Sequence, residues 1–376
     1  MKRLHHFRVY FLLAILLTAG IVVVAREHRP SFLRPDLHLN AYVTSADGDL
    51  TVVDLVKLSA VTHVAIGGGL AGLREHPTRP EIWGVSTVGG FAWALDARTN
   101  QLSAKIPVGA LPYSVDFSRD GKRLYTTSGG GNSLVAIDCQ SHAILGKSDT
   151  DLEPVLAKVT PDGKKILVVN HRGGSLGIHD AETLAVEKLV PVVPQPEDVV
   201  VLPDSSVAFV LSRSQHRISV VDLRRGLLLT NLELAGRPTQ MLLKPDGGEL
   251  YVISPESHGL QAINTWTHEV GDFVLLGSAP TRGVLLPDAS ELFVSDNAAG
   301  RITPVDIVNR RVSRPVSAGQ APTALALDPS ENPSLLLAVN EGSSDLTVIR
   351  VRSDSQSLLT MIPVGNRPQD LVVKLF

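Results

Sequence analysis

Histidine and arginine side chains recur at matching places along this 376-residue chain, and they are its clearest candidates for binding chemistry. His171, His216 and His258 follow one another at steps of 45 and 42 residues. An imidazole can ligate a metal or a haem iron, and a guanidinium binds carboxylates through two parallel hydrogen bonds. The pattern predicts a cationic binding surface, made of Tyr113, His171, Arg172, Arg213, His216, Arg237, His258, Arg282 and Arg367. The alternative is that these are solvated loop residues paired with neighbouring acids.

Several kinds of catalytic and metal site are excluded by the residues that are missing. The single cysteine, Cys139, leaves no disulfide, no cysteine-based zinc site and no CxxCH haem attachment. There is no GxSxG nucleophile motif and no glycine-rich phosphate loop. The sequence therefore predicts no catalytic residue and no metal site.

The elements that would position these side chains repeat every 42 residues. A column of aspartates has this step, and so does a column of prolines. The first column is Asp54, Asp96, Asp138, Asp180, Asp222, Asn264 and Asp306, and the second is Pro112, Pro154, Pro196, Pro238, Pro280 and Pro322. Each unit reads as four short strands with Asp-Gly turn signals, as at Asp162-Gly163, and no sustained helical period follows residue 30.

Four strands in about 42 residues is the size of one β-propeller blade. We therefore predict an all-β propeller over residues 38–376, with eight four-stranded blades and seven as the alternative. The chain ends with one first strand, Pro368–Phe376, and the first unit lacks one, so this strand should pair with residues around 41–45 and close the ring. Loops between second and third strands would share an upper face with the inter-blade loops, and this face carries the candidate residues above.

A family resemblance lies in the repeats themselves. Tyr42-Val43-Thr44, Glu249-Leu-Tyr-Val252 and Ile106-Pro-Val-Gly109 resemble the YVTN-type repeats of surface-layer and YncE-like periplasmic propellers. That resemblance implies the fold and carries no catalytic residue. An eight-blade count is also similar to the haem-binding propeller of cytochrome nitrite reductases, which implies haem as a cofactor; the repeats alone predict none.

The N-terminal residues have the pattern of an export signal. Lys2, Arg3 and Arg8 precede an apolar run, Val9–Ala25, which predicts a signal peptide or an uncleaved membrane anchor over residues 1–25 and a linker over 26–37. The protein is then expected in the periplasm or outside the cell, touching a membrane only through this segment. A net charge of −3 argues against nucleic-acid binding.

These features together favour an exported, non-catalytic binding protein of the cell envelope. Its expected partner is another protein, a surface polymer or a small anionic ligand. Two alternatives remain open, a haem-associated propeller like that of nitrite reductases and a propeller lactonase or related hydrolase.

Overall fold

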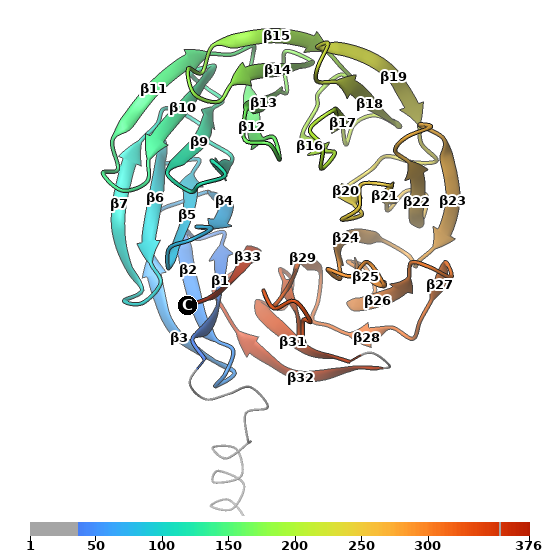
Figure 1. Cartoon of the computed structure of the whole chain (residues 1–376). Coiled ribbons are helices and arrows are strands. Elements are labelled where there is room, and N and C mark those ends of the chain that lie inside the picture. The colour runs from blue at the N-terminus through green and yellow to red at the C-terminus, as the bar shows by residue number, and fades with distance from the viewer. Residues whose placement is uncertain (1–36, 353–354) are drawn as a thin grey trace, which may run out of the picture.

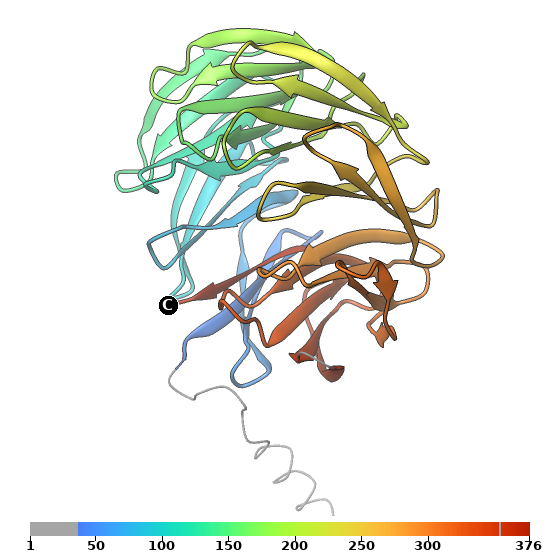
Figure 2. The ribbon, with the colours of Figure 1, turned by 45° about the vertical axis from the view of Figure 1, so that its right-hand side comes forward.

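Eight antiparallel sheets stand around a central axis in the computed structural model, which describes residues 37–352 and 355–376 (Figure 1). The sheets are arranged like the blades of a propeller, and Figure 2 shows the ring from the side with each sheet twisted. The count of eight is confirmed and the alternative of seven is wrong. No helix among the described residues is long and apolar enough to span a membrane. The predicted export segment, residues 1–25, lies outside the described residues.

Each blade is numbered in chain order, and its strands run from the channel outward unless stated. Blade 1 contains β1 (Leu39–Ser45), β2 (Asp49–Asp54), β3 (Ser59–Ala65) and, innermost, β33 (Pro368–Leu375). Blade 2 contains β4 (Leu70–Glu75), β5 (Glu81–Ser86), β6 (Phe91–Asp96) and β7 (Gln101–Pro107). Blade 3 contains β8 (Val115–Phe117), β9 (Arg123–Ser128), β10 (Ser133–Asp138) and β11 (Ile144–Asp149). Blade 4 contains β12 (Pro154–Val159), β13 (Lys165–Asn170), β14 (Ser175–Asp180) and β15 (Val186–Pro191).

The second half of the ring follows the same plan. Blade 5 contains β16 (Asp198–Val201), β17 (Val207–Leu211), β18 (Arg217–Asp222) and β19 (Leu227–Glu233). Blade 6 contains β20 (Gln240–Leu243), β21 (Glu249–Ser254), β22 (Gly259–Asn264) and β23 (Val270–Leu275). Blade 7 contains β24 (Pro280–Leu285), β25 (Glu291–Asp296), β26 (Arg301–Asp306) and a split outer strand, β27 (Arg311–Val312) and β28 (Val316–Ser317). Blade 8 contains β29 (Pro322–Leu327), β30 (Leu335–Asn340), β31 (Asp345–Arg352) and β32 (Ser355–Pro363).

The ring is closed by the last strand of the chain, as predicted. Strand β33 pairs antiparallel with β1, and the register places Ala41 opposite Val373 and Val43 opposite Leu371. The first blade thus receives its innermost strand from the other end of the chain, which leaves no blade with an open inner half.

The repeated aspartates hold turns. The carboxylate of Asp138 accepts hydrogen bonds from the backbone N–H groups of Gln140 (3.0 Å) and Ser141 (2.7 Å), just beyond strand β10. In the other turn, Asp162 accepts from Lys164, and Gly163 adopts a positive φ of 76° that a side chain would oppose. These columns therefore have a structural role in every blade that keeps them.

The core lies between neighbouring blades, because each sheet packs face to face on the next. Strands β5 and β6 bury Trp83 and Trp93 completely, and Tyr42 and Tyr125 are buried at the same level of their own blades. Phenol groups also bind across blades: Tyr42 donates to the carbonyl of Ala97 and Tyr125 to that of Ala181. Packing and hydrogen bonding together fix the angle between blades.

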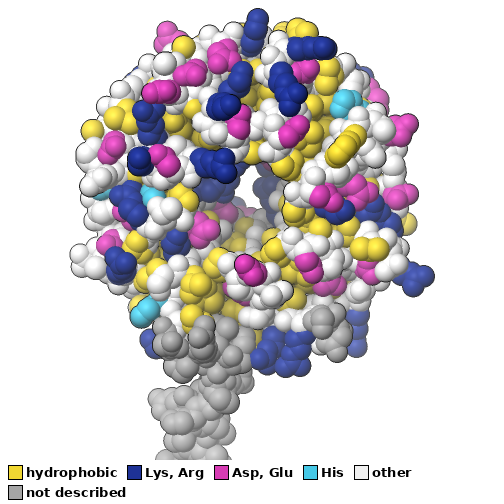
Figure 3. Space-filling model, in the orientation of Figure 1, with side chains coloured by type: hydrophobic (Ala, Val, Ile, Leu, Met, Phe, Trp, Pro, Cys, Tyr) yellow, Lys and Arg dark blue, Asp and Glu magenta, His cyan; other side chains and the backbone are white. Residues whose placement is uncertain are grey.

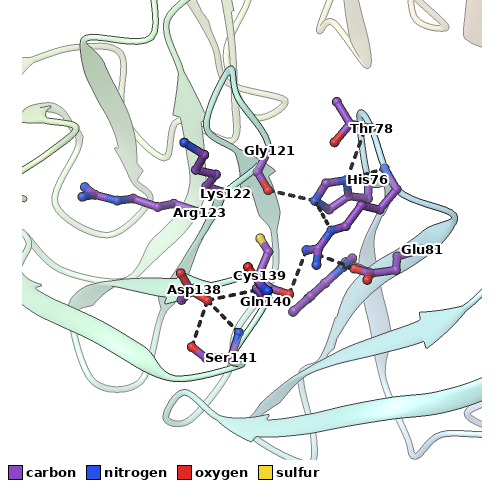
Figure 4. Close-up of polar contacts among 12 residues, drawn as sticks. His76, Thr78, Glu81, Gly121, Lys122, Arg123, Asp138, Cys139, Gln140 and Ser141 are labelled. Atoms are coloured by element: carbon purple, nitrogen blue, oxygen red, sulfur yellow. Dashed lines mark hydrogen bonds and ion pairs between the residues drawn. The ribbon is translucent and has the colours of Figure 1, made fainter.

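Polar contacts fasten several blades on the lower face, where the turns after first and third strands lie. Between blades 2 and 3, Nδ1 of His76 accepts the backbone N–H groups of Thr78 and Arg79, and Nε2 donates to the carbonyl of Gly121 at 2.8 Å (Figure 4). Arg79 then donates to the carbonyl of Cys139 at 2.8 Å. Burial raises the pKa of the Cys139 thiol to about 12, so it stays protonated and unreactive.

Blade 7 departs from the pattern in its outer strand. Pro304, in the middle of β26, has no N–H to give to the ladder, and the outer strand divides there into β27 and β28. Ser313 instead donates its N–H to the carbonyl of Pro304 at 2.8 Å. Residues 313–315 therefore bulge away from the sheet.

Candidate functional site

The central channel is lined by the innermost strand of every blade, and two positions of each strand face it. Side chains alternate along a strand, so positions two and four after the proline column share a face. Positions three and five are mostly buried in the core, as Val115 and Val199 are, whereas positions two and four are partly exposed in most blades. Figure 3 shows the opening, with basic side chains at its rim.

The upper layer of the channel, position two, carries three ionisable side chains. Asp198 comes from blade 5, Arg282 from blade 7 and Asp370 from blade 1, and all three are partly buried. Neither adjacent pair belongs to neighbouring blades, so their charges act on one another across the channel. Among the residues that the structure describes, none of the three is in a short ion pair.

The electrostatics of this layer follow from its poor contact with water. Burial raises the pKa of Asp198, although the charges of Arg213 and Arg282 act the other way. Burial likewise raises the pKa of Asp370 against the charges of Arg74 and Arg282. Burial and the charge of Arg213 lower the pKa of Arg282 itself. The three groups thus stabilise one another only in part, and a bound ligand could contact them.

The lower layer, position four, divides the channel into two walls. Blades 2 to 4 contribute Arg74, Asp116 and Lys158, and Nζ of Lys158 lies 3.3 Å from Oδ2 of Asp116. The remaining blades contribute Val200, Leu242, Val284, Ala326 and Val372. A ligand in this channel would meet charge on one side and hydrocarbon on the other.

Channel side chains also cover the free edges of the inner strands. Oγ of Ser114 accepts the N–H of Ala157 in the next blade, and Oδ2 of Asp116 accepts the N–H of Val159. The amide of Gln240 makes both hydrogen bonds to the backbone of Gly283, with distances of 2.7 and 3.3 Å. Each inner strand is therefore satisfied without another strand, which keeps the channel open.

The structure disperses most of the nine predicted binding residues over the upper face. Oε2 of Glu256 contacts Nε2 of His216 at 3.0 Å and accepts from the N–H and Nε of Arg237, while Arg213 pairs with Glu197 at 3.1 Å. Arg367 pairs with Glu341, far from these in the ring. These contacts are the acid-paired arrangement that the sequence left open as the alternative.

The other predicted residues differ in how much they are engaged. Nδ1 of His258 hydrogen-bonds the carbonyl of Ser278 at 2.8 Å, and Nδ1 of His171 the carbonyl of Pro196 at 3.3 Å. Arg172 is exposed. Tyr113 is partly buried and lies so close to Gly129 that a Cβ there would come within 3.2 Å of its ring. Of the nine, Arg282 lies in the channel.

Sequence reasoning missed the two carboxylates that face Arg282. Asp198 and Asp370 follow the proline column, where a loop was expected, but they begin strands that line the channel. The signal that could have found them is the column itself: at position two, Asp198, Arg282 and Asp370 are charged where Leu156 and Ala324 are not.

Comparison with known proteins gives similarity of fold. No family model and no curated protein sequence matches this chain. Among solved structures, the dihydro-haem d1 dehydrogenase NirN in complex with DHE has a TM-score of 0.76 at 14% identity, over 92% of this chain and 77% of that one. Apo AztD from Citrobacter koseri has a TM-score of 0.69 at 11% identity, over 90% and 98%. Hydrazine synthase from Kuenenia stuttgartiensis has 0.59 at 18%, over 75% and 96%.

This chain is a β-propeller. Identities this low establish the architecture and leave the YVTN-type family as an interpretation of the repeats. The function must therefore be argued from the channel.

Proposed function

We propose that this protein is an exported, non-catalytic binding propeller whose channel holds a small zwitterionic ligand. The observation that supports this is the upper layer, where a guanidinium lies between two carboxylates without a short ion pair. A ligand carboxylate would receive hydrogen bonds from Arg282, and a ligand ammonium would lie against Asp198 or Asp370. The charged group at one end of the ligand thus replaces the anion that the sequence predicted.

The apolar wall gives this ligand a second feature. Val200, Leu242 and Val284 lie one layer below, on the same side of the channel as Arg282 and Asp198. A ligand with a short hydrocarbon part below its charged groups would bury that part there. Amino acids and their N-methylated relatives have this form.

The test is isothermal titration calorimetry of the purified full chain with a panel of amino acids and betaines. Arg282→Gln and Asp198→Asn should each weaken binding about 10- to 100-fold, the worth of one charge-assisted hydrogen bond. Arg237→Gln, an upper-face arginine already paired with Glu256, is the matched control and should leave the affinity unchanged. Binding that survives both channel substitutions would place the ligand elsewhere.

A tetrapyrrole is the second candidate, and one feature of the upper face favours it. The Nδ1 atoms of His171 and His258 are held by backbone carbonyls, an arrangement that leaves Nε2 available to an iron. The similarity in fold to NirN, which is described in complex with DHE, is compatible with this. Addition of haem to the full chain should then give a Soret band that His171→Ala or His258→Ala shifts, and no band would exclude it.

Export is part of the proposal and rests on Val9–Ala25. A fusion of residues 1–40 to a reporter that is active only outside the cytoplasm should be active. A reporter that remains inactive would contradict the proposed location.

A further inference from the structure

A groove of 1140 Å³ opens on the lower face between blades 7 and 8. One side is formed by the turn around Asp288, the start of β25 at Glu291 and the bulge at Arg314. The other is formed by the longer turn at 331–334 and by the hairpin of β31 and β32, including Arg352 and Gln356. The groove lies apart from the channel and from every residue of the upper face discussed above.

Two departures from the repeat produce this groove. The first is the bulge at 313–315, which Pro304 causes by interrupting the outer strand. The second is the length of the hairpin in blade 8, where β31 and β32 continue to pair through Val351 with Gln356 and Arg352 with Ser355. In blade 7 the corresponding hairpin ends earlier, at the pair of Asp306 with Arg311. The turn of blade 8 therefore extends past the junction instead of filling it.

The preceding junction, between blades 6 and 7, shows what fills this position when the hairpin is short. There Glu249 begins β21 just as Glu291 begins β25, and Arg310 from the turn of blade 7 donates to its carboxylate. The same guanidinium lies 5.6 Å from the ring centre of Tyr251 and contacts Asp272 at 3.4 Å. The protein thus uses its own arginine side chain to neutralise the glutamate at this position.

Glu291 has no such guanidinium. Nε2 of Gln356 donates to it at 3.0 Å, and among the described residues it takes part in no ion pair. Burial raises the pKa of Glu291, and the negative charges of Asp306 and Asp288 raise it further. Four carboxylates line the groove, those of Asp288, Glu291, Asp306 and Glu331, against the two exposed arginines Arg314 and Arg352.

We propose that this groove binds an extended polypeptide segment of a partner protein, with an arginine side chain of that segment seated on Glu291. The chemistry repeats that of Arg310 on Glu249, with the guanidinium supplied from outside. A free guanidinium compound would leave most of 1140 Å³ empty, since pockets for small ligands are about 300–1000 Å³. The inference is independent of any ligand in the channel.

The probe is a fluorescently labelled, capped pentapeptide, Ala-Ser-Arg-Ser-Ala, measured by fluorescence anisotropy on the full chain. Replacement of its arginine by citrulline, which has the same shape without the charge, should weaken binding at least tenfold. Glu291→Gln should weaken it about 10- to 100-fold. Glu256→Gln, on the upper face, is the control and should change nothing.

A second variant and a pH series keep the test independent of folding defects. Gln356→Arg supplies an internal guanidinium and should abolish peptide binding while circular dichroism stays unchanged. Affinity should also fall as the pH is lowered through the raised pKa of Glu291, because the protonated acid cannot hold the cation. That dependence should be smaller in Glu291→Gln, in which Asp288, Asp306 and Glu331 still titrate beside Arg314 and Arg352.

Three results would overturn the proposal. One is equal affinity for the arginine and citrulline peptides, and another is an affinity that Glu291→Gln leaves unchanged. The third is argininamide binding as tightly as the pentapeptide, which would make the groove a small-molecule site. Absence of any anisotropy change up to millimolar protein would also overturn it.

Discussion

The junctions on either side of blade 7 begin from nearly the same sequence and end in opposite states. Glu249-Leu-Tyr-Val252 opens the second strand of blade 6, and Glu291-Leu-Phe-Val294 opens that of blade 7. The first glutamate is covered by Arg310 and the junction is filled. The second meets only an amide, and the junction is a groove.

The difference teaches that a repeat fixes the strands more firmly than it fixes the contacts between blades. Arg310 follows Glu249 by 61 residues, and Arg352 follows Glu291 by the same 61. Spacing alone would predict the same ion pair twice. Two extra residues before β30 shift the strand register in blade 8, and Arg352 becomes part of a strand pair with Ser355 instead of a turn.

The largest effect is expected from opening the filled junction. Arg310→Met removes the cation from Glu249 and leaves a partly buried carboxylate uncompensated, which should cost about 2–3 kcal/mol of unfolding free energy. Arg311→Met, at the exposed neighbouring residue, is the control and should stay within about 0.5 kcal/mol. Urea denaturation of the two variants measures both, and equal losses would show that the junction does not depend on Arg310.

The two glutamates should respond with opposite signs to loss of charge. Glu249→Gln weakens the ion pair and should cost about 1–2 kcal/mol, whereas Glu291→Gln removes an unfavourable charge and should stabilise by about 0.5–1 kcal/mol at pH 7. The folded protein holds a proton on Glu291 more tightly than the unfolded chain does. Stability due to this group is therefore greatest below its unfolded pKa and is lost as the pH rises through its raised folded pKa.

Denaturation as a function of pH checks this sign. The gain from Glu291→Gln should shrink towards zero near pH 4, where both the acid and the amide are neutral. A gain that is constant with pH would mean that the substitution acts through packing and not through charge.

Filling the groove from within should have a smaller effect. Gln356→Arg places a guanidinium beside Glu291 and should stabilise the chain by about 0.5–1 kcal/mol, as a partly exposed ion pair does. In a double-mutant cycle this gain should vanish when Glu291 is already Gln. A gain that persists in the double variant would rule out the ion pair as its source.

The smallest effect concerns one hydroxyl group. Tyr251 donates to Glu249 at 2.6 Å, and burial together with this hydrogen bond raises its pKa to about 12. Tyr251→Phe should cost about 0.5 kcal/mol, and Phe293→Tyr should give no gain. Ultraviolet titration should lose a phenol that ionises near pH 12 in the first variant only; loss of a phenol with an ordinary pKa would contradict the assignment.

The architecture could be predicted from sequence because its signals are local. Asp138 holds its own turn and Pro154 begins its own strand, so a step of 42 in such residues specifies blades directly. Closure was also predictable, since the strand missing at one end appears at the other. The candidate site was harder, because a loop histidine and a loop arginine look the same whether they face a ligand or a neighbouring acid.

What escaped prediction depends on distance in three dimensions. Asp198 and Asp370 are separated by 172 residues and act on Arg282 only because the ring places their strands around one channel. The groove depends on a missing N–H at Pro304 and on a small shift in register, whose consequences appear only when two blades are packed together. Export and the family of the repeats remain predictions.

The pairing of β33 with β1 also sets an order in time. About 320 residues separate the two strands, and at roughly 10 residues per second β33 would leave the ribosome about half a minute after β1. Until then blade 1 has three strands, and the inner edge of β1 is unpaired. A chain interrupted before Pro368 keeps that edge and is open to aggregation or proteolysis. Completion of synthesis and completion of the fold are thereby coupled, and an unfinished product can be told from a finished one by a single exposed strand.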